Sequence, residues 1–480
     1  MKVVQLGVEF APIAKVGGLG EVIQGLSREL TRQKVQVDVI LPKYDFLDVR
    51  KLSKLKVEVP EFTCLGHTNA MWSATCEGCS LHLLESSSNY FRRGKIYGCE
   101  DDTTRFLYFS RACLEYLKLK NEPINILHLH DWHVAVCALL AKEIFSLPIK
   151  AILLTIHNGE HQGKSAPWDL DAIGLKGADF LHPDRLQDDD RAHPKTLNLL
   201  KGGIVYADWV NTVSPTYAKE LLTTSIGGPL SKTFRKYKDK LSGLLNGIDQ
   251  TIWDPSNDPN LPRPYAASSP LPEILSAKEA ARAALRKRFS LSLTHRPWVG
   301  SITRLVPQKG PELIEQGLRQ TLTLGGSFLL LGSSPLPKIQ KHFDKLKEEF
   351  AGNPQTLLHF EYDEGLAHLL FAALDFLLVP SHFEPCGLTQ LLAMRYGTLP
   401  IVRATGGLKD TVFDEGAPHP QNGFVFRDLD PTALTATLQR AVSLFQNDPE
   451  KCNKLLIRDM KQDHSWTHLS KNYLDLFRNL

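Results

Sequence analysis

Short runs of leucine and β-branched residues alternate along the chain with stretches whose apolar positions recur at helical spacing. In the first half these runs read KVVQLGV, QVDVILP, NILHLHD, KAILLTIH and WVNTVS, and in the second half RPWVGSITR, SFLLLGSS, TLLHFEY, DFLLVPS and TLPIVRAT. Each run is almost continuously apolar and ends at a turn signal, which is typical of parallel strands covered by helices on both faces. The pattern therefore predicts an α/β fold with doubly wound sheets.

A stretch rich in proline, serine and asparagine separates the two halves of this pattern. It reads DPSNDPNLPRPYAASSPLPEIL before it continues as a basic helix, as a connector between domains would. A chain of 480 residues is also too long for one ordinary core. We therefore predict two doubly wound domains, residues 1–245 and 246–456, and an amphipathic final helix over about 457–480 that packs back on the first domain.

The composition is that of a globular protein, with 42% apolar residues, 23% charged residues and a formal net charge of +3. So small a charge does not predict a nucleic-acid surface. The first strand carries Gln5 and Glu9 where a signal peptide would be apolar, and the longest later apolar stretch, LLFAALDFLLVP, contains Asp375. We therefore expect a cytoplasmic protein with no membrane span and no nucleic-acid partner.

The eight cysteines are scattered through a long chain, which predicts reduced thiols rather than a disulfide framework. Cys76 and Cys79 form a lone CxxC motif. Zinc binding or redox chemistry by this pair is disfavoured, because no second pair follows at the spacing that a four-ligand site requires.

The residues that follow the strands carry the chemistry, because ligands of open α/β sheets bind outside the carboxyl ends of the strands. In the first half these residues are Lys15, Gly17, Gly18, Asp131, Trp132, His133, His157 and Asn158. In the second half they are Arg304, Lys309, Glu384, Gly406, Gly407, Asp410 and Thr411. Three cations and two glycine-rich helix starts suit a diphosphate, and the carboxylates, histidine and tryptophan suit a sugar.

Each of these signals also has an ordinary structural interpretation. A glycine pair at a helix start is often only a tight turn, and GGLGEV has neither the dinucleotide-binding nor the P-loop spacing. An arginine near a lysine is often a solvated face, and HLHDWH is a possible but unconvincing metal cluster. Asp131 could serve as the cap of a helix that begins at His133 instead of, or as well as, binding a ligand.

Taken in order, the motifs resemble those of the bacterial glycogen synthases and plant starch synthases. The stretches that carry the resemblance are KVGGLGEV, HLHDWH, TIHN, LKGGIVYADWVNTVSPTYAKE, LLNGIDQTIWDP, TRLVPQKG, VPSHFEPCGLTQL and RATGGLKDTV. They cover nearly the whole chain in the order and spacing of that family. The resemblance implies a GT-B fold, with two Rossmann-like domains and the active site in the cleft between them.

The resemblance also implies the reaction. Glucose would pass from ADP-glucose to the 4-hydroxyl at the non-reducing end of an α-1,4-glucan such as glycogen, with retention of the α-configuration. No cofactor or metal would be needed. No pair of carboxylates suggests a nucleophile and an acid of the kind that retaining glycosidases use. A front-face displacement, in which the leaving phosphate helps to take the acceptor proton, is the mechanism the family suggests.

By the same resemblance, each motif residue receives a role. The residues expected to act in catalysis are Lys15, His157, Arg304, Lys309 and Glu384. The residues expected to bind the nucleotide sugar are Lys15, Gly17, Gly18, Tyr362, Gly387, Leu388, Thr389, Gly406 and Gly407. The residues expected to border the sugar or the acceptor are Asp131, Trp132, Asn158 and Asn246. Within this set Glu384 would bind glucose hydroxyls and Tyr362 would stack on the base.

The chain departs from the family pattern at a few positions. Glu21 replaces the usual aspartate, and His161 stands where an aromatic residue usually follows TIHN. Arg92 replaces an acidic residue, which puts one acceptor-side contact in doubt. Leu392 stands where related retaining transferases carry a second glutamate, as is usual for glycogen synthases, so the ribose must be held otherwise. None of these departures touches the phosphate-binding set.

Two other functions remain open from the sequence. One is a glycosyltransferase of the same fold with another acceptor, which HLHDWH and LLNGID disfavour. The other is a non-catalytic glucan-binding protein, which should have lost at least one of the four residues Lys15, Arg304, Lys309 and Glu384. A nicotinamide oxidoreductase is disfavoured by the missing dinucleotide-binding fingerprint.

Overall fold

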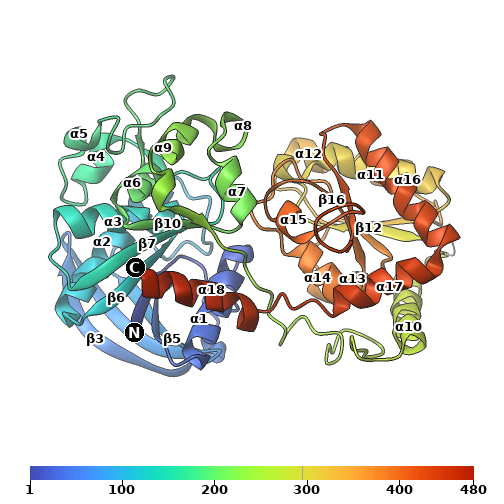
Figure 1. The fold of residues 1–480 in the computed structure, drawn as a ribbon. Coiled ribbons are helices and arrows are strands. Elements are labelled where there is room, and N and C mark those ends of the chain that lie inside the picture. Colours follow the sequence, from blue (N-terminus) through green and yellow to red (C-terminus); the bar gives the residue numbers. More distant parts are fainter. Residues whose placement is uncertain (294–295) are drawn as a thin grey trace. The chain divides into compact units, whose positions relative to one another are not determined.

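The computed structural model describes residues 1–293 and 296–480 and divides the chain into two compact units (Figure 1). The first unit comprises residues 1–247 and 466–480, and the second comprises residues 248–465. The division therefore falls two residues beyond the predicted boundary. The predicted final helix differs more: α17 (Pro449–Met460) stays with the second unit, and only α18 (Trp466–Asn479) belongs to the first.

The first unit is built on one sheet with the strand order β11-β10-β7-β6-β1-β2-β5-β4-β3. Neighbouring strands are parallel from β11 to β5, and β4 and β3 extend the sheet as antiparallel strands. The strands are β1 (Lys2–Leu6), β2 (Gln36–Pro42), β3 (Ser53–Cys64), β4 (His67–Cys76), β5 (Cys79–Ser86), β6 (Ile124–His130), β7 (Ile149–Ile156), β10 (Trp209–Thr212) and β11 (Leu241–Gly243). A small separate ladder joins β8 (Lys164–Ser165) to β9 (Leu197–Asn198).

Helices cover both faces of the first sheet (Figure 1). The helices of this unit are α1 (Gly18–Arg32), α2 (Asp102–Lys120), α3 (Trp132–Glu143), α4 (Pro167–Asp171), α5 (Gly177–Phe180), α6 (Leu199–Tyr206), α7 (Pro215–Glu220), α8 (Thr224–Gly227), α9 (Ser231–Lys236) and α18. The C-terminal α18 packs against α1, where Gly25 leaves room for the Trp466 indole: a Cβ on Gly25 would lie 2.2 Å from Trp466 Nε1. Gln33 Nε2 also donates to Ser470 Oγ at 2.7 Å. These contacts fix the end of the chain on the first unit.

The second unit contains an all-parallel sheet with the strand order β14-β13-β12-β15-β16-β17. Its strands are β12 (Trp298–Ile302), β13 (Ser327–Leu331), β14 (Thr356–His359), β15 (Phe376–Val379), β16 (Leu399–Arg403) and β17 (Phe424–Phe426). Its helices are α10 (Leu271–Phe289), α11 (Pro311–Thr323), α12 (Pro337–Glu349), α13 (Glu364–Ala373), α14 (Thr389–Arg395), α15 (Gly406–Thr411), α16 (Pro431–Asn447) and α17.

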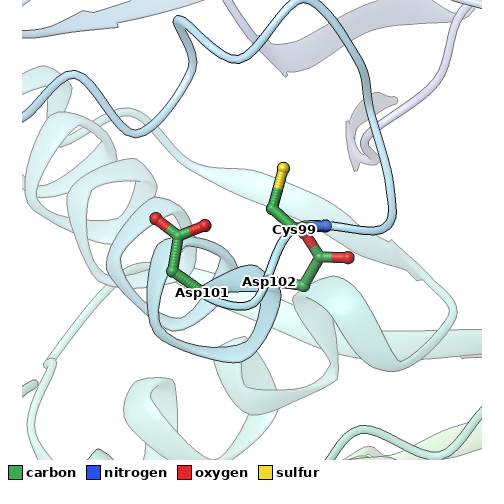
Figure 2. A group of neighbouring side chains, drawn as sticks. All are labelled: Cys99, Asp101 and Asp102. Atoms are coloured by element: carbon green, nitrogen blue, oxygen red, sulfur yellow. Dashed lines mark hydrogen bonds between the residues drawn. The ribbon is translucent and has the colours of Figure 1, made fainter.

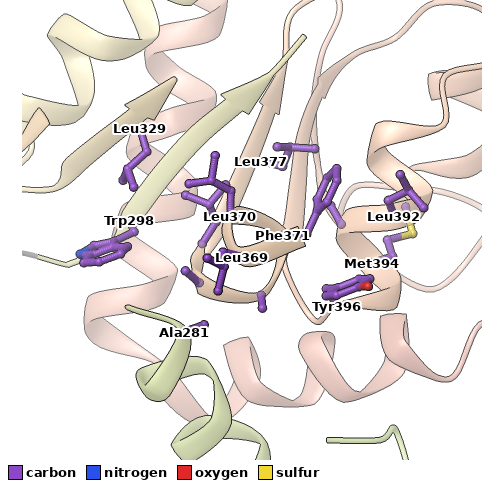
Figure 3. Packing of buried hydrophobic residues seen from close by; sticks show 14 of the residues in the cluster. Ala281, Trp298, Leu329, Leu369, Leu370, Phe371, Leu377, Leu392, Met394 and Tyr396 are labelled. Atoms are coloured by element: carbon purple, nitrogen blue, oxygen red, sulfur yellow. The ribbon is translucent and has the colours of Figure 1, made fainter. Parts of the chain in front are cut away.

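Alternate residues of the second sheet enter two separate cores. Trp298 and Leu377 pack into one core with α10, α13 and α14 (Figure 3), while Val299 and Phe376 pack into the other with α11 and α16. Each strand is therefore buried on both faces, which explains its continuously apolar sequence. This arrangement confirms the prediction of doubly wound parallel sheets.

Two further expectations bear on the class of protein. None of the eight cysteines, all of which lie in the described part of the chain, forms a disulfide, and most of them are buried. None of the helices in the described part of the chain is long and apolar enough to cross a bilayer.

Candidate active site

The loop after β1 is organised by Glu9, a buried carboxylate that the sequence did not single out as functional. Glu9 Oε2 accepts hydrogen bonds from the backbone N–H groups of Val16 at 2.8 Å and Gly17 at 3.0 Å, and Tyr97 Oη donates to Glu9 Oε1 at 2.6 Å. The Gly17 amide, which we expected to face a phosphate, is thus occupied within the protein. The loop leads directly into α1, whose first residue is Gly18.

Lys15 lies on this loop and pairs with Glu21, one of the residues that depart from the family pattern. Its Nζ is 2.6 Å from Glu21 Oε1, and both side chains are partly exposed. The longer side chain of Glu21 therefore still reaches the lysine. Because a solvent-exposed ion pair contributes little free energy, an incoming phosphate could displace Glu21 at small cost.

Asp131 connects the carboxyl ends of β6 and β7. Its Oδ1 accepts from His157 N at 2.7 Å and from Asn158 N at 3.5 Å, and its own N–H donates to the Thr155 carbonyl oxygen at 2.9 Å. Its backbone has φ of 61° and ψ of −176°, a conformation that residues other than glycine rarely adopt. Burial raises the pKa of the Asp131 carboxyl to about 7, against the opposing effect of the two backbone donors.

Asp131 stands at the N-cap position of α3 but does not cap the helix with its side chain. Helix α3 begins at Trp132, one residue earlier than the sequence suggested, and the Asp131 side chain makes no capping hydrogen bond to it. The strained residue instead holds the backbone of the TIHN segment in place. Strain of this kind is typical of functional sites, where the surrounding structure must impose it.

The other expected residues of the first unit lie near this strand edge or at the end of the unit. Trp132 is half-buried and packs against Gly163, where a Cβ would come within 2.2 Å of the indole ring. Asn246 is buried, and within residues 1–293 and 296–480 its Oδ1 has no hydrogen-bond partner. A buried acceptor without a partner is costly, so Asn246 is suited to a ligand that donates to it.

The histidines of HLHDWH do not form a metal centre. His128 Nε2 is 2.7 Å from Thr155 Oγ1, and the two ring nitrogens of His130 face Gln5 and His157. Burial lowers the pKa of His128 and of His157 to about 3, so both rings are neutral. Among the described residues these histidines are not grouped so that their ligand atoms could meet at one ion.

A different group, Cys99, Asp101 and Asp102, does place possible ligand atoms close together (Figure 2). Its carboxylates are already engaged by the protein. Asp102 accepts from the Gly98 amide at 2.8 Å, from the Cys99 amide at 3.1 Å and from buried Arg105, and Asp101 pairs with Arg93 at 2.6 Å. The group therefore holds the turn before α2, and we assign no metal to it.

In the second unit, an ion pair joins the ends of the neighbouring strands β12 and β15. Lys309 Nζ is 2.5 Å from Glu384 Oε2, which also accepts from Ser381 Oγ at 2.8 Å. Glu384 is only 5% exposed, whereas Arg304 on the same β12 loop is exposed. A carboxylate and an ammonium group side by side can bind a hydroxyl and a phosphate of one ligand.

The two loops that carry this ion pair are bonded to each other. His382 N donates to the Gln308 carbonyl oxygen at 2.8 Å, and Gln308 Nε2 donates to the Phe383 carbonyl oxygen at 3.2 Å. Gly310 has φ of 65°, and a Cβ there would lie 2.4 Å from the Pro380 carbonyl oxygen. Glycine at this position therefore lets the two loops approach closely enough to form the ion pair.

Gly406 and Gly407, which we expected to bind the nucleotide sugar, allow two backbone segments to pack closely. A Cβ on Gly406 would lie 1.9 Å from the Glu384 carbonyl oxygen, and a Cβ on Gly407 would lie 2.0 Å from that of Cys386. The Gly407 amide donates to the Glu384 carbonyl oxygen at 3.0 Å. The pair therefore lets the start of α15 lie directly against the loop that carries Glu384.

The turn before α14 contains Gly387, Leu388 and Thr389. Gly387 has φ of 71°, Leu388 is the N-cap residue, and Thr389 is the first residue of the helix. Gln390, which the sequence did not single out, holds the turn: its Nε2 donates to the Gly387 carbonyl oxygen at 2.9 Å and to Thr411 Oγ1 at 3.2 Å. The helix start is thus tied to α15.

Tyr362 lies after β14 and is 83% exposed, with its Oη 3.4 Å from Glu364 Oε2. An exposed aromatic ring at a strand end offers a face on which a planar group can stack.

A polar cavity of about 230 Å³ lies in the first unit, at the amino ends of the strands. Its lining includes Lys2, Asp38, His82, Tyr116 and Lys120. It contains none of the expected site residues, and its charged groups, which include Glu122, pair with one another and with Glu58. The cavity is therefore separate from the strand edge that carries the candidate site.

Comparisons with known proteins agree with this architecture. Residues 2–236 match the family model described as the starch synthase catalytic domain, and residues 285–455 match that of glycosyl transferases group 1. The chain is 43% identical to a glycogen synthase of Protochlamydia amoebophila over 497 residues, covering 100% of this chain and 99% of that protein. It is 42% identical to the probable starch synthase 4 of Arabidopsis thaliana, covering 99% of this chain and 46% of that protein.

Solved structures give the same result. The catalytic domain of starch synthase IV from Arabidopsis thaliana, bound to ADP and acarbose, matches with a TM-score of 0.93 and 41% identity, covering 100% of this chain and 99% of that chain. A sucrose-phosphate synthase from Thermosynechococcus elongatus matches with a TM-score of 0.62 and 17% identity over 100% of this chain and 98% of that chain, a likeness of fold alone.

Proposed function

Because the chain belongs to the family of bacterial glycogen synthases and plant starch synthases, retaining glycosyltransferases of the GT-B fold, we propose that it transfers glucose from ADP-glucose to an α-1,4-glucan. The acceptor is the 4-hydroxyl at the non-reducing end of the glucan. The observation that carries the proposal is the Lys309–Glu384 ion pair at the ends of β12 and β15. The two loops that carry these residues are hydrogen-bonded to each other, which fixes the pair in place.

In this proposal the second unit holds the donor. The Glu384 carboxylate accepts from glucose hydroxyls, while Lys309 and Arg304 meet the diphosphate. Negative charge grows on the diphosphate as the glycosidic bond breaks, so cations placed around it stabilise the transition state more than the bound donor. Lys15 is a further cation for the same phosphates, released from Glu21 when the donor binds.

In the first unit, His157 is proposed to lie beside the reacting carbon. Its backbone is fixed by the Asp131 carboxylate, which supports a precise position for this segment. Asp131, Trp132, Asn158 and Asn246 border the sugar or acceptor. The acceptor proton passes to the leaving diphosphate, because the retained configuration and the lack of a carboxylate pair of the glycosidase type favour a front-face displacement.

The donor base is the least constrained part of the proposal. Tyr362 would stack on the base, and stacking tolerates any planar ring. We propose ADP-glucose as the better donor, supported by the ADP in the related starch synthase IV structure, with measurable use of UDP-glucose. Polar contacts to the edge of the base would be enough to give a tenfold or larger preference.

One assay tests the reaction and the donor together. The full-length protein is incubated with glycogen and either ADP-glucose or UDP-glucose, and the released nucleoside diphosphate and the growth of glucan chains are measured. We expect chain growth with both donors and a higher kcat/KM for ADP-glucose. Release of nucleotide without chain growth would indicate another acceptor, and binding of glycogen without turnover would indicate a non-catalytic protein.

We propose further that transfer needs no metal ion, because Arg304, Lys309 and Lys15 supply the positive charge that a diphosphate leaving group requires. The assay is repeated after treatment with EDTA. Full activity is the expected result. Loss of activity that a divalent cation restores would overturn this part of the proposal and leave the transfer reaction standing.

A further inference from the structure

A chain of buried polar side chains runs beneath the strand edge that carries His157. Gln5 from β1, Ser27 from α1 and His130 from β6 are all fully buried. Polar groups are costly to bury without hydrogen bonds, and here each one is bonded to the next. The chain ends at His157, which directly follows β7 and is partly exposed.

The direction of these hydrogen bonds can be read from the Ser27 end. Ser27 Oγ donates to the Ile23 carbonyl oxygen at 2.6 Å, so it accepts from Gln5 Nε2, which lies 3.1 Å away. This orients the Gln5 amide with Oε1 toward His130 Nε2, at 2.9 Å. Since an amide oxygen can only accept, the hydrogen of the neutral His130 ring is on Nε2.

The same reasoning extends to His157. Burial holds the pKa of His130 well below its usual value and lowers the pKa of His157 to about 3, so both rings are neutral. With its hydrogen on Nε2, His130 offers Nδ1 as an acceptor, and His157 Nε2 lies 3.0 Å from this atom. The hydrogen of His157 is therefore on Nε2, and its Nδ1 keeps a free lone pair.

We propose that Gln5 and His130 are positioning residues that fix the ring tautomer of His157 and present its Nδ1 as a hydrogen-bond acceptor. The inference rests on the proposed place of His157 beside the reacting sugar, because the hydroxyl groups of that sugar are the donors such an acceptor would meet. Neither Gln5 nor His130 touches substrate in this proposal. They act through the orientation and tautomer of His157.

One competing arrangement exists, in which the Gln5 amide is rotated by half a turn. Gln5 Nε2 would then donate to His130 Nε2, and both histidine rings would carry their hydrogens on Nδ1. Ser27 would have to donate to Gln5 Oε1 and give up its bond to Ile23. The hydroxyl of Ser27 therefore selects the arrangement, although it lies three links away from His157.

The backbone of His157 is held independently of its ring. Asp131 Oδ1 accepts from His157 N at 2.7 Å, and this bond does not involve Gln5 or His130. A substitution at Gln5 should therefore change the tautomer and orientation of the ring while leaving the main chain of the TIHN segment in place.

The direct test is to observe the ring hydrogens in the full-length enzyme. Long-range proton–nitrogen spectra of protein labelled with 15N-histidine show which nitrogen of each neutral ring is protonated, and His157→Gln assigns the His157 signals. We expect wild-type His157 and His130 to carry hydrogen on Nε2. Gln5→Met removes the acceptor for His130 and should leave His157 as a mixture of both tautomers.

Two further variants sharpen this test. Ser27→Ala leaves Gln5 in place but frees its amide to rotate, so it should also mix the tautomers, and it covers the case in which Gln5→Met does not fold. Thr155→Val is the matched control. It removes the buried bond between Thr155 Oγ1 and His128 Nε2, which lies beside the polar chain but does not lead to His157.

Kinetics with the nucleotide sugar and glycogen give the second readout. We expect Gln5→Met to lower kcat about tenfold and Ser27→Ala to lower it less, with KM for the donor within about twofold of wild type. Thr155→Val should lose stability but keep both the His157 tautomer and kcat.

Three results would overturn the inference: a wild-type His157 protonated on Nδ1, unchanged His157 signals in Gln5→Met, or an equal fall of kcat in Thr155→Val. A wild-type enzyme without transferase activity would instead refute the proposed function. The spectra would still decide the tautomer in that case.

Discussion

The two units each carry a glycine pair at the start of a helix, and the two pairs have different physical reasons to be glycine. In the second unit, Cβ atoms on Gly406 and Gly407 would lie 1.9 Å and 2.0 Å from backbone carbonyl oxygens of the Glu384 loop. In the first unit, a Cβ on Gly17 would meet nothing within 4 Å. Packing thus requires glycine at positions 406 and 407, whereas the position of Gly17 faces open space.

The difference shows that the expected site residues of the second unit are held by contacts within that unit. The Glu384 loop is held by α15, by Gln390 and by its bonds to the Gln308 loop, so the second-unit residues are fixed before any ligand arrives. The Lys15 loop is bonded to Glu9 through the Val16 and Gly17 amides, and Lys15 itself pairs with the partly exposed Glu21. We infer that the Lys15 loop is the part of the first unit that responds to the donor.

The largest effect is expected for Gly407→Ala. The new Cβ cannot fit beside the Cys386 carbonyl oxygen without moving backbone, so we expect a loss of about 3 kcal/mol in the free energy of unfolding of the second unit. Displacement of the Glu384 loop should also abolish transfer. Thermal unfolding and the glycogen assay measure the two effects. A stable, active Gly407→Ala enzyme would break the comparison, because the packing role would then be absent.

Lys15→Ala should affect catalysis without affecting folding. Removing a cation from the diphosphate is expected to cost about 3 kcal/mol of transition-state stabilisation, or about a hundredfold in kcat, while the melting temperature stays unchanged. Steady-state kinetics with ADP-glucose and glycogen measure this. Glu21→Gln serves as a matched variant, because it removes the partner of Lys15 but keeps the lysine. A Lys15→Ala enzyme with near-normal kcat would show that Lys15 does not act on the phosphates.

The sequence predicted the parallel strands and the residues at their ends, because a strand buried on both faces has a continuously apolar sequence that is easily recognised. It did not predict the strands β3, β4 and β5, although QVDVILP before them was recognised. Much of β3 is exposed at the sheet edge, so its sequence lacks the apolar run. The predicted helix over 457–480 was too long for a related reason: α17 and α18 are both amphipathic, and the pattern runs across the break between them.

For the candidate site, the sequence identified residue types but not their partners. The motifs pointed to Asp131 and His157, yet the positive φ of Asp131 and its bond to the His157 amide follow from how β6 and β7 lie side by side. Glu9 and Gln390 were missed because each is a single polar residue whose only signal is its burial in the fold. The roles of the predicted site residues stay predictions.

Buried ion pairs give the two units different responses to pH. Burial opposes charge on His82, but hydrogen bonds to Asp38 and Glu58 outweigh it and raise the pKa of His82 to about 9 from its usual 6.5. The charged histidine therefore stabilises the first unit fully below pH 6.5, and this contribution is lost as pH rises through 9. In the second unit, Arg282 and Arg296 keep the pKa of buried Asp375 below its usual 3.8, so that carboxylate does not titrate in this window.

We therefore expect the first unit to lose about 2.5 kcal/mol of unfolding free energy from His82 between pH 6.5 and 9, and the second unit to lose none from its buried pair. Hydrogen exchange in peptides from β2 and β5, compared with peptides from β15, measures the two units separately. His82→Gln should remove most of the pH dependence of the first unit. Equal pH responses of both units, or an unchanged response in His82→Gln, would contradict this account.

The smallest effect, and the one that decides the comparison of the glycine pairs, is expected for Gly17→Ala. Gly17 has φ of −147° and ψ of −160°, an extended conformation that alanine adopts freely, and its Cβ would meet no atom within 4 Å. We expect the free energy of unfolding to rise by about 0.5 kcal/mol, because alanine restricts the unfolded chain. If this open space is where a diphosphate approaches the backbone, the methyl group should lower kcat/KM for ADP-glucose about threefold. Gly407→Ala is its counterpart, since it should damage folding and activity together. A Gly17→Ala enzyme that is stabilised but kinetically identical to wild type would show that the open space beside Gly17 is not used by the donor, and Lys15 would then have to act on the phosphates without its neighbouring glycine.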